Sequence, residues 1–347
     1  MKFVSNILYR FVRLWVTITL RLFYVKIECT GHEHIKTDKP YIVLANHQNT
    51  LLDALLVLCF SNIKNLHFLA RADIFNGKKI VKQLLEFFKI APIYRRTDGI
   101  SAFKKLDEVW ANSKTILNRG DSICIFPEGT HSATYEYRPL KKGFLKLAQS
   151  AEDENLEFLP IIIHFENHYS AISKVWIEIK EPIPQSEKSA SEVEAVFKET
   201  MVLADKNEDA TAVFNHAAKI GLDFDAAVRM FRSGRQDEIT SIVTSSWGDK
   251  LLLLLTSPLF LLASCLFLPF DFISKYLSLK MKDKQFSLSV QLVIKWIFYS
   301  FIFFAFIVYD LLTHPYWYET IIKILIVFGL GVFHKAYLYK VKRVLSK

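Results

Sequence analysis

Ala45-Asn46-His47-Gln48-Asn49-Thr50-Leu51-Leu52-Asp53 joins two apolar runs and indicates the class of structure to which the chain belongs. The run before it, 41–45, is typical of a buried strand, and the run after it, 54–58, is typical of a buried helix. His47 therefore lies at a strand-to-helix corner. In α/β proteins such corners, at the carboxyl ends of strands, are where the chemistry is placed.

His47 and Asp53 are the residues of this stretch that could act together in a reaction. They are six positions apart, which on one continuous helix would put them on different faces. They can meet only if the chain turns after His47 and Asp53 lies in the first helical turn. A carboxylate on one imidazole nitrogen then leaves the other nitrogen to act as a general base. The alternative is a solvated His47 beside an Asn46 that caps the helix.

A second polar turn follows another buried strand. The strand is expected at 121–126, and Pro127-Glu128-Gly129-Thr130-His131-Ser132 follows it directly. A glycine-containing turn in this position can present backbone N–H groups and a carboxylate to a ligand. Together the two stretches resemble the glycerolipid acyltransferases, the 1-acylglycerol-3-phosphate acyltransferase superfamily, whose hallmarks are an Asn-His…Asp block and Phe-Pro-Glu-Gly-Thr. The resemblance covers about residues 25–185.

The resemblance implies a reaction and a set of roles. A fatty acyl group would pass from a thioester donor, acyl-CoA or acyl-ACP, to a hydroxyl of a glycerol phosphate lipid, with no metal and no organic cofactor. His47 would be the general base, oriented by Asp53. Glu128 would contact the hydroxyls of the acceptor, with Thr130 beside it, and Gly129 would let the backbone approach closely.

The first block departs from the family pattern in its spacing. The family usually has His-x4-Asp, whereas this chain has His-x5-Asp, with Asn49 where Ser is usual. A bulge in the turn would absorb the extra residue. A glycerol-3-phosphate acyltransferase subgroup of fungi shares the longer spacing, so the acceptor stays open between lysophosphatidate, the commoner one in the family, and glycerol 3-phosphate.

The acceptor phosphate needs a cation. The family's second block ends in an Arg that receives this phosphate, and Arg95 is the best match, with Arg96 as the alternative. Arg suits the role because its planar guanidinium binds phosphate bidentately. In the third block, Phe-Pro-Glu-Gly-Thr and the residues after it, His131 stands where the family has Arg. Lys141 and Lys142 are expected to supply the missing positive charge. We assign Lys142 to the substrate-binding set.

The alternation of short strand-like and helical runs predicts an α/β fold with a mainly parallel sheet flanked by helices, as in the glycerol-3-phosphate acyltransferase fold. The proline-containing run 159–162 resembles the strand that lines the family's acyl-thioester site, or it is a plain buried strand. Strands are expected at 25–29, 41–45, 66–70, 121–126, 158–165 and 174–180, and helices at 51–60, 76–89, 100–118 and 139–151.

Three further segments complete the expected organisation around the acyltransferase domain, 26–185. Residues 1–25 have polar residues on one helical stripe and apolar residues elsewhere, the pattern of an amphipathic helix in a membrane interface or of a terminal helix packed on its own domain. Residues 186–247 predict a helical arm of short amphipathic helices. Residues 248–347 contain three apolar runs (251–270, 288–312 and 321–332) and predict a membrane-embedded helical region.

Composition agrees with a lipid bilayer as partner. The chain of 347 residues is 51% hydrophobic and 14% aromatic, with a net charge of +9. A basic, apolar chain suits an anionic membrane surface, and no nucleic-acid-binding motif is present. Its four cysteines are scattered, which predicts reduced packing residues rather than disulfides. The motif Gly31-His32-Glu33-His34 is too short of ligands to predict a metal site.

Charge predicts the orientation in the membrane. The Lys-rich loop 275–284 and the basic tail should be cytoplasmic, and the connection 313–319, without Lys or Arg, should lie outside. If the run 251–270 also crossed, the catalytic domain would face the side without acyl thioesters. Pro258 is expected to interrupt its helix. We therefore predict that 251–270 does not span and that the catalytic domain is cytoplasmic.

One function of a different class remains. A non-catalytic lipid-binding membrane protein on the same fold is favoured by the longer spacing in the first block and by His131. The intact residues His47, Asp53 and Glu128 oppose it. The sequence therefore predicts a membrane-bound acyltransferase as the first interpretation and a lipid-binding protein as the second.

Overall fold

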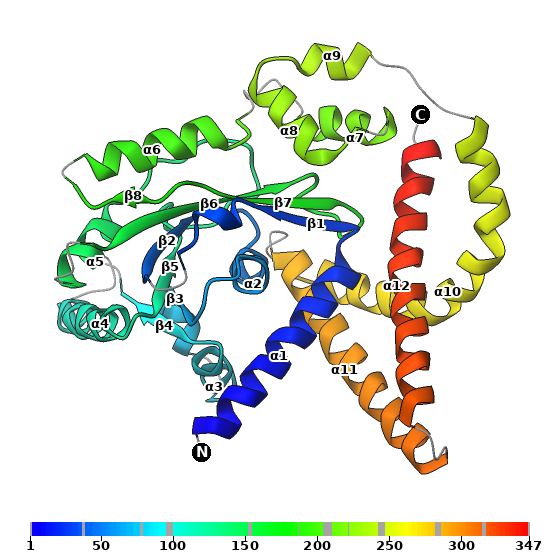
Figure 1. Cartoon of the computed structure of the whole chain (residues 1–347), viewed down its shortest axis with the longest axis horizontal. Coiled ribbons are helices and arrows are strands. Elements are labelled where there is room, and N and C mark those ends of the chain that lie inside the picture. The colour runs from blue at the N-terminus through cyan, green and yellow to red at the C-terminus, as the bar shows by residue number, and fades with distance from the viewer. Residues whose placement is uncertain are drawn as a thin grey trace.

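The computed structural model describes most of the chain, with short gaps. The described residues are 2–36, 39–76, 79–94, 100–151, 155–186, 188–203, 210–220, 222–241, 247–281, 286–313 and 317–345. An α/β domain forms one side of the molecule and long helices extend from the other side (Figure 1).

One sheet carries the α/β domain, in the strand order β1-β7-β6-β2-β5-β3-β4, with β8 paired to β6. All pairs are parallel except β6–β7 and β6–β8. The predicted mainly parallel sheet is therefore confirmed, whereas β4 and β8 were not predicted. The strands are β1 (Lys26–Thr30), β2 (Tyr41–Ala45), β3 (Leu66–Arg71), β4 (Ile90–Ile93), β5 (Ser122–Ile125), β6 (Glu157–Phe165), β7 (Lys174–Ile179) and β8 (Ile183–Pro184).

Helices on the sheet follow the predicted alternation, with two differences. The run 76–89 is divided into the 3-10 turn η2 (Ala72–Asn76) and the helix α3. The helix expected at 139–151 begins only at Gly143, because the Lys141 N–H bonds the Pro127 carbonyl at 2.7 Å and holds the preceding residues across the second polar turn. The helices are α2 (Leu51–Phe60), α3 (Lys79–Phe87), α4 (Ile100–Asn118), α5 (Gly143–Ala151) and α6 (Ser189–Thr200).

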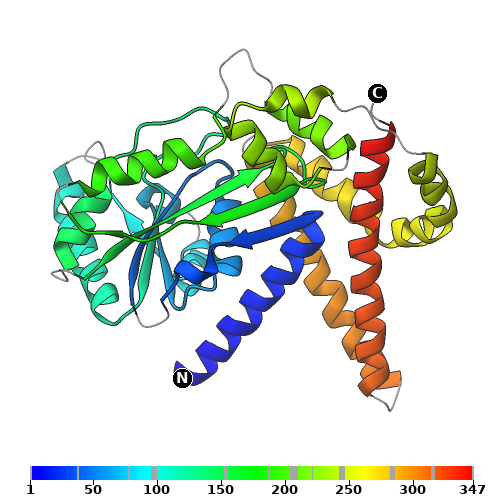
Figure 2. The same cartoon turned by 45° about the horizontal axis from the view of Figure 1, so that its top comes forward.

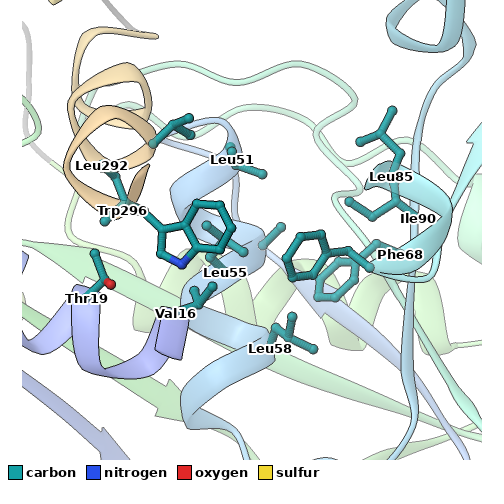
Figure 3. Close-up of a pocket in the computed structure, with 13 residues that line it drawn as sticks. Val16, Thr19, Leu51, Leu55, Leu58, Phe68, Leu85, Ile90, Leu292 and Trp296 are labelled. Carbon is teal, nitrogen blue, oxygen red and sulfur yellow. The ribbon is translucent and has the colours of Figure 1, made fainter. Parts of the chain in front are cut away.

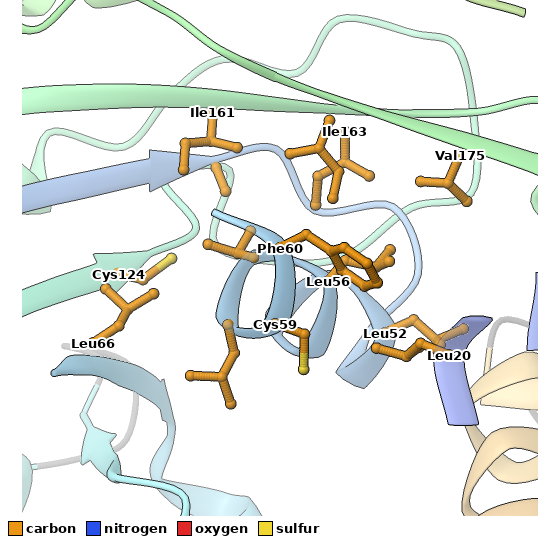
Figure 4. Packing of buried hydrophobic residues seen from close by; sticks show 14 of the residues in the cluster. Leu20, Leu52, Leu56, Cys59, Phe60, Leu66, Cys124, Ile161, Ile163 and Val175 are labelled. Atoms are coloured by element: carbon orange, nitrogen blue, oxygen red, sulfur yellow. The ribbon is translucent and has the colours of Figure 1, made fainter. Parts of the chain in front are cut away.

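Strand β2 is buried on both faces, which explains its unbroken apolar sequence. Tyr41 and Val43 face one core, which α1 (Lys2–Phe23) and α2 fill from below the sheet. Figure 4 shows this core, with α2 residues packed under the β6 residues Ile161 and Ile163. Ile42 and the next alternate residue face a second core with α5 and α6. This two-sided burial fixes the register of β2 and thus where the chain leaves it.

The central position of β2 and β5 brings the two polar turns together. The strands are parallel neighbours, with Ile42 opposite Ile123 and Leu44 opposite Ile125. Since both strands end at the same edge of the sheet, the residues after Ala45 and after Ile125 leave it side by side. This is the geometry at which α/β folds bind their ligands.

Helix α1 packs on its own domain and also exposes apolar side chains. Its C-terminal part is buried in the core below the sheet through Val16, Leu20 and Phe23. Nearer the N-terminus, large apolar side chains are exposed, namely Ile7, Leu8, Phe11 and Leu14. The helix is therefore docked on its own domain and presents an apolar strip on its outer side, which suits a lipid surface.

The segment after the sheet is only partly a separate arm. Helix α6 belongs to the α/β domain, since Val193 and Phe197 are fully buried in the upper core. The helices α7 (Ala210–Ile220), α8 (Phe224–Arg232) and α9 (Gln236–Ser241) pack with one another and against Trp176 of β7. Arg232 of α8 also bonds Glu178 at 3.1 Å, which ties the arm to the sheet.

Three helices near the C-terminus are long and apolar enough to cross a membrane: α10 (Trp247–Leu279), α11 (Ser287–Thr313) and α12 (Trp317–Leu345). The expected interruption at Pro258 is wrong, because Pro258 and Pro269 both lie inside the continuous helix α10. Instead α10 is curved (Figures 1 and 2). A proline removes one backbone hydrogen bond and bends a helix, and the remaining bonds of α10 keep it continuous.

Candidate active site

His47 and Asp53 meet at the end of β2, because the chain turns after His47 and Asp53 lies in the first turn of α2. The Nδ1 atom of His47 lies 2.8 Å from Oδ2 of Asp53. The same Oδ2 accepts the backbone N–H groups of Gln48 at 2.8 Å and Asn49 at 2.7 Å. Asp53 is fully buried in the first turn of α2, whereas His47 keeps part of its ring exposed. The arrangement fixes the ring and leaves its Nε2 edge for a substrate.

The extra residue of the first block is absorbed at Thr50. Thr50 immediately precedes α2 with φ 53° and ψ −119°, a backbone conformation that a β-branched residue rarely adopts. The turn is closed by the Leu52 N–H, which bonds the Asn49 carbonyl at 3.0 Å. The expected bulge is thus a strained turn, and the contact between His47 and Asp53 is kept despite the longer spacing.

Glu128 links the two polar turns from behind the histidine. Its Oε1 accepts the backbone N–H of His47 at 3.1 Å, and its Oε2 accepts a bond from Nη2 of Arg138. Arg138 also donates to the His47 carbonyl at 2.8 Å and to the Thr130 carbonyl at 2.6 Å. Glu128 is 5% exposed. In the structure it holds the backbone of His47 in place, and contact with acceptor hydroxyls stays a prediction.

Aromatic rings define the orientation of His47. The Phe126 ring stacks on the imidazole with the ring centres 4.1 Å apart. The His131 ring meets His47 edge-on at 5.6 Å and meets Phe286, the residue before α11, at 5.0 Å. His131 thus lies between His47 and the membrane helices, rather than at the outer end of a phosphate clamp.

A cavity of about 460 Å³ opens in front of His47. Gly129, Thr130 and His131 line it, and their contact with substrate stays a prediction. Gly129 has φ 75°, and a Cβ atom at this position would lie 3.0 Å from Nζ of Lys141, at the end of a flexible side chain that can move. Glycine is therefore favoured at this position by the backbone conformation.

Two cations line this cavity among the described residues: Arg71, which ends β3, and Lys141. Lys142, the lysine assigned to substrate binding, is exposed and does not line the cavity. Arg95 and Arg96, the expected phosphate ligands, lie outside the described residues; Tyr94, just before them, lines the cavity.

A second cavity, of about 360 Å³, continues from the first and shares Leu51, Ala54 and Phe68 with it. Its lining is made of apolar side chains from α1, α2, β3, α3, β4 and α11, apart from Thr19. Figure 3 shows the indole of Trp296 projecting from α11 toward α2. An almost wholly apolar space that adjoins the cavity in front of His47 suits a hydrocarbon chain.

The remaining predictions for this region concern β6 and the cysteines. Residues 159–162 are buried in the centre of the sheet and line neither cavity, so a plain buried strand describes them. Burial raises the pKa of the Cys124 thiol, in β5, and of the Cys59 thiol, in α2. Both thiols are protonated at neutral pH, which makes them poor nucleophiles.

Sequence reasoning missed two cations of the site. Arg71 is the last residue of β3, the neighbour of β5, and a polar residue at the carboxyl end of a strand was a usable signal. Arg138 lies in the irregular segment before α5, where no periodicity predicts which way a side chain points. Its partner Glu128 was singled out, and a buried carboxylate demands a cation.

Comparisons with known proteins show what the chain is similar to. The family model Acyltransferase matches residues 26–164. A probable 1-acyl-sn-glycerol-3-phosphate acyltransferase of Mycoplasma genitalium is 26% identical over 157 residues, 44% of this chain and 52% of the relative. The 1-acyl-sn-glycerol-3-phosphate acyltransferase alpha of Mus musculus is 24% identical over 162 residues, 46% of this chain and 53% of the relative. The chain spans about half the length of the curated relatives it matches.

A solved structure is also similar. The crystal structure of a 1-acyl-sn-glycerophosphate acyltransferase from Thermotoga maritima aligns with a TM-score of 0.44 and 23% identity, covering 58% of this chain and 81% of that one. The match of residues 26–164 includes the His47–Asp53 block and the Glu128 block. Over residues 26–164 the chain is therefore similar to the acyltransferase family and to curated glycerolipid acyltransferases.

Proposed function

We propose that the protein transfers a fatty acyl group from acyl-CoA or acyl-ACP to a hydroxyl of 1-acylglycerol 3-phosphate. The observation that carries the proposal is the contact of His47 Nδ1 with Asp53 at 2.8 Å beside a cavity that continues into an apolar one. The names of the relatives support lysophosphatidate as the acceptor. The longer spacing of the first block keeps glycerol 3-phosphate as the second candidate.

The chemistry follows from the orientation of His47. Its Nε2 takes the proton of the acceptor hydroxyl as the oxygen attacks the thioester carbonyl. Asp53 holds the other nitrogen and stabilises the imidazolium that forms. Collapse of the tetrahedral intermediate breaks the C–S bond and expels the thiolate, which takes the proton from His47 to give the free thiol, and no acyl-enzyme is needed. The N–H groups of Gly129 and Ser132 are bonded within the turns, so the oxyanion requires other donors.

The two cavities divide the substrates by polarity. The acyl chain of the donor would occupy the apolar cavity, which ends against Trp296 of α11. The phosphate of the acceptor would lie at the polar mouth, where Arg71 and Lys141 line the wall in front of His47. Arg95 remains the proposed phosphate ligand from the family's second block, with Lys142 and His131 in secondary roles.

Neighbouring lysines give a matched test of the phosphate site. We expect Lys141→Ala to raise the KM for the acceptor about tenfold or more, because a charge-assisted contact is worth roughly 1.5–3 kcal/mol. Lys142→Ala, one residue away and exposed, should change it less than about twofold. Steady-state kinetics with varied acceptor measure both. A larger effect of Lys142→Ala than of Lys141→Ala would mean that Lys142 binds the phosphate.

The acceptor is tested with purified full-length protein in detergent and oleoyl-CoA as donor. Release of free CoA is followed without acceptor, with lysophosphatidate and with glycerol 3-phosphate. We expect release that depends on lysophosphatidate. Release with glycerol 3-phosphate alone would select the second acceptor, and binding of lipid without any release would support the lipid-binding class instead.

The catalytic domain would lie on the cytoplasmic side. Both ends of the α11–α12 hairpin contact the α/β domain: Ser289 lies 2.6 Å from Thr50, and the Tyr339 hydroxyl lies 2.6 Å from Glu166. The hairpin therefore begins and ends on the side of the domain. Cytoplasmic acyl thioesters and the basic loop 275–284 support the assignment of that side.

Helix α10 would not span, although Pro258 does not interrupt it. Phe260 and Phe267, separated by two turns of α10, both stack against His334 of α12. Asp271 of α10 bonds Lys295 of α11 at 2.5 Å. These contacts reach only the domain-proximal parts of α11 and α12, which favours a curved helix lying across the hairpin over one running along it.

Single-cysteine labelling tests the orientation. In a variant without native cysteines, Ser191→Cys in α6 and Lys280→Cys after α10 should react with a membrane-impermeant maleimide from one side, and Thr313→Cys at the hairpin tip from the other. All three positions are outside the two cores. Labelling of the first two positions from opposite sides would mean that α10 crosses the membrane.

A further inference from the structure

We infer that the first turns of α11 are part of the active site and that Ser289 is a positioning residue for the pair His47–Asp53. The inference rests on the acyl transfer proposed above and extends its machinery into the membrane hairpin. Helix α11 lies outside the residues that match the family model, 26–164. The matching domain would therefore depend on a segment that is not part of it.

Thr50 provides the reason why the turn needs support. A threonine at φ 53° and ψ −119° is strained, because its branched side chain crowds the backbone there. Such a conformation persists only where the surroundings hold it. The first block contains one residue more than the usual spacing, and Thr50 is where the chain absorbs it.

Ser289 contacts this turn and stabilises it. Its hydroxyl lies 2.6 Å from the Thr50 hydroxyl and 3.3 Å from the Asn49 carbonyl oxygen. If Thr50 donates to Ser289 and Ser289 donates to Asn49, each hydroxyl proton is used once. Thr50 and Ser289 are 6% and 4% exposed, so water does not replace these bonds readily.

The backbone of Asn49 links Ser289 to the pair His47–Asp53. The Asn49 residue whose carbonyl Ser289 contacts gives its N–H to Oδ2 of Asp53 at 2.7 Å. The same Oδ2 faces Nδ1 of His47. Loss of Ser289 would let Thr50 relax toward an ordinary conformation, which rotates the Asn49 peptide and moves Asp53 relative to the imidazole.

Other residues of the same helix also face the site. Phe286, immediately before α11, contacts the ring of His131, which in turn contacts His47. Two turns further on, Leu292 and Trp296 form a wall of the apolar cavity. The hairpin thus contacts the turn 46–53, His131 of the third block and the apolar cavity from one side. The position of the hairpin in the membrane would therefore affect the geometry of all three.

Ser289→Ala tests the inference, with Ser300→Ala as the matched control. Ser300 lies on the same helix and accepts the indole N–H of Trp15 at 2.6 Å, so it also ties α11 to the rest of the protein. Its hydroxyl donates to the Trp296 carbonyl of its own helix, and Ser300 lines neither cavity. Two readouts are used on the full-length protein in nanodiscs: acyl-transfer kinetics and hydrogen exchange of the peptide covering 46–53.

Ser289→Ala should lower kcat roughly ten- to a hundredfold, since a displacement of about 1 Å at the reacting groups costs that much. The KM values for both substrates should change less than about twofold. Exchange in 46–53 should become faster. Ser300→Ala should do neither. In a Thr50→Gly background, where glycine accepts a positive φ without strain, the same Ser289→Ala change should reduce kcat clearly less.

The outcomes separate this inference from the function on which it rests. Unchanged kcat and unchanged exchange in Ser289→Ala would overturn the positioning role. Equal losses in Ser289→Ala and Ser300→Ala would overturn it too, because they would mean general loosening of α11. Faster exchange in 46–53 in a protein whose wild type transfers no acyl group would keep the structural coupling and overturn the proposed function.

Discussion

His47→Ala is expected to lower the rate of acyl transfer by about 10²–10⁴, the range typical of general-base assistance, while the protein stays folded and in the membrane. The reason is geometric: His47 Nδ1 is held by Asp53 at 2.8 Å, and its other edge faces the cavity. The imidazole is partly exposed and its removal leaves the Asp53 bonds to the Gln48 and Asn49 amides intact. Initial rates with lysophosphatidate measure the effect.

His131 is the internal control for that result. Its ring lies 5.6 Å from the ring of His47 and lines the same cavity, so it is the rival base among the described residues. Because the proposed base is His47, whose Nδ1 is held by Asp53 at 2.8 Å, His131→Ala should lower the rate far less than His47→Ala. The opposite order of effects, or a His47→Ala protein within a few-fold of wild type, would remove His47 from the mechanism.

Arg138→Ala should have the largest effect on stability. Removal of the guanidinium leaves the buried carboxylate of Glu128 without its cation, which costs about 3–5 kcal/mol. It also removes donors from the His47 and Thr130 carbonyls. We expect a fall in Tm on the order of 10 °C, measured by thermal unfolding in detergent, together with loss of activity.

Arg229 provides a matched arginine. It pairs with Asp225 at 2.5 Å on the exposed face of α8, and such surface pairs are worth about 0–1 kcal/mol. Arg229 also lies over the Trp176 ring, 5.6 Å from its centre, so Arg229→Ala should lower Tm slightly and clearly less than Arg138→Ala. Adding Glu128→Gln to Arg138→Ala should recover part of the lost stability, since the uncompensated charge disappears. If Arg138→Ala is as mild as Arg229→Ala, Glu128 does not depend on this partner.

The sequence predicted those features that follow from local pattern. The apolar runs placed β2, α2 and β5, and the parallel order of β2 and β5 then brought His47 and Glu128 to one edge of the sheet. The contact of His47 with Asp53 followed because a turn was the only way to join them. The strand β4 was missed because Pro92 argues against a strand; β4 lies at the sheet edge, where proline is tolerated.

Features that depend on distant or irregular segments could not be predicted. Arg138 reaches Glu128 from a stretch without regular secondary structure. Ser289 meets Thr50 across 239 positions of sequence, and neither residue carries a pattern that points to the other. Pro258 was weighed as an interruption, but its neighbours hold α10 as a continuous curved helix. In each case tertiary packing decides what the local sequence leaves open.

The central claim is direct transfer of the acyl group to an acceptor hydroxyl that His47 activates. Purified protein is given oleoyl-CoA labelled in the acyl chain together with lysophosphatidate, and lipids and protein are analysed separately. The account predicts label in phosphatidate, none bound to the protein, and a loss of this product in His47→Ala. Label released as free fatty acid at the same rate with and without lysophosphatidate would contradict it.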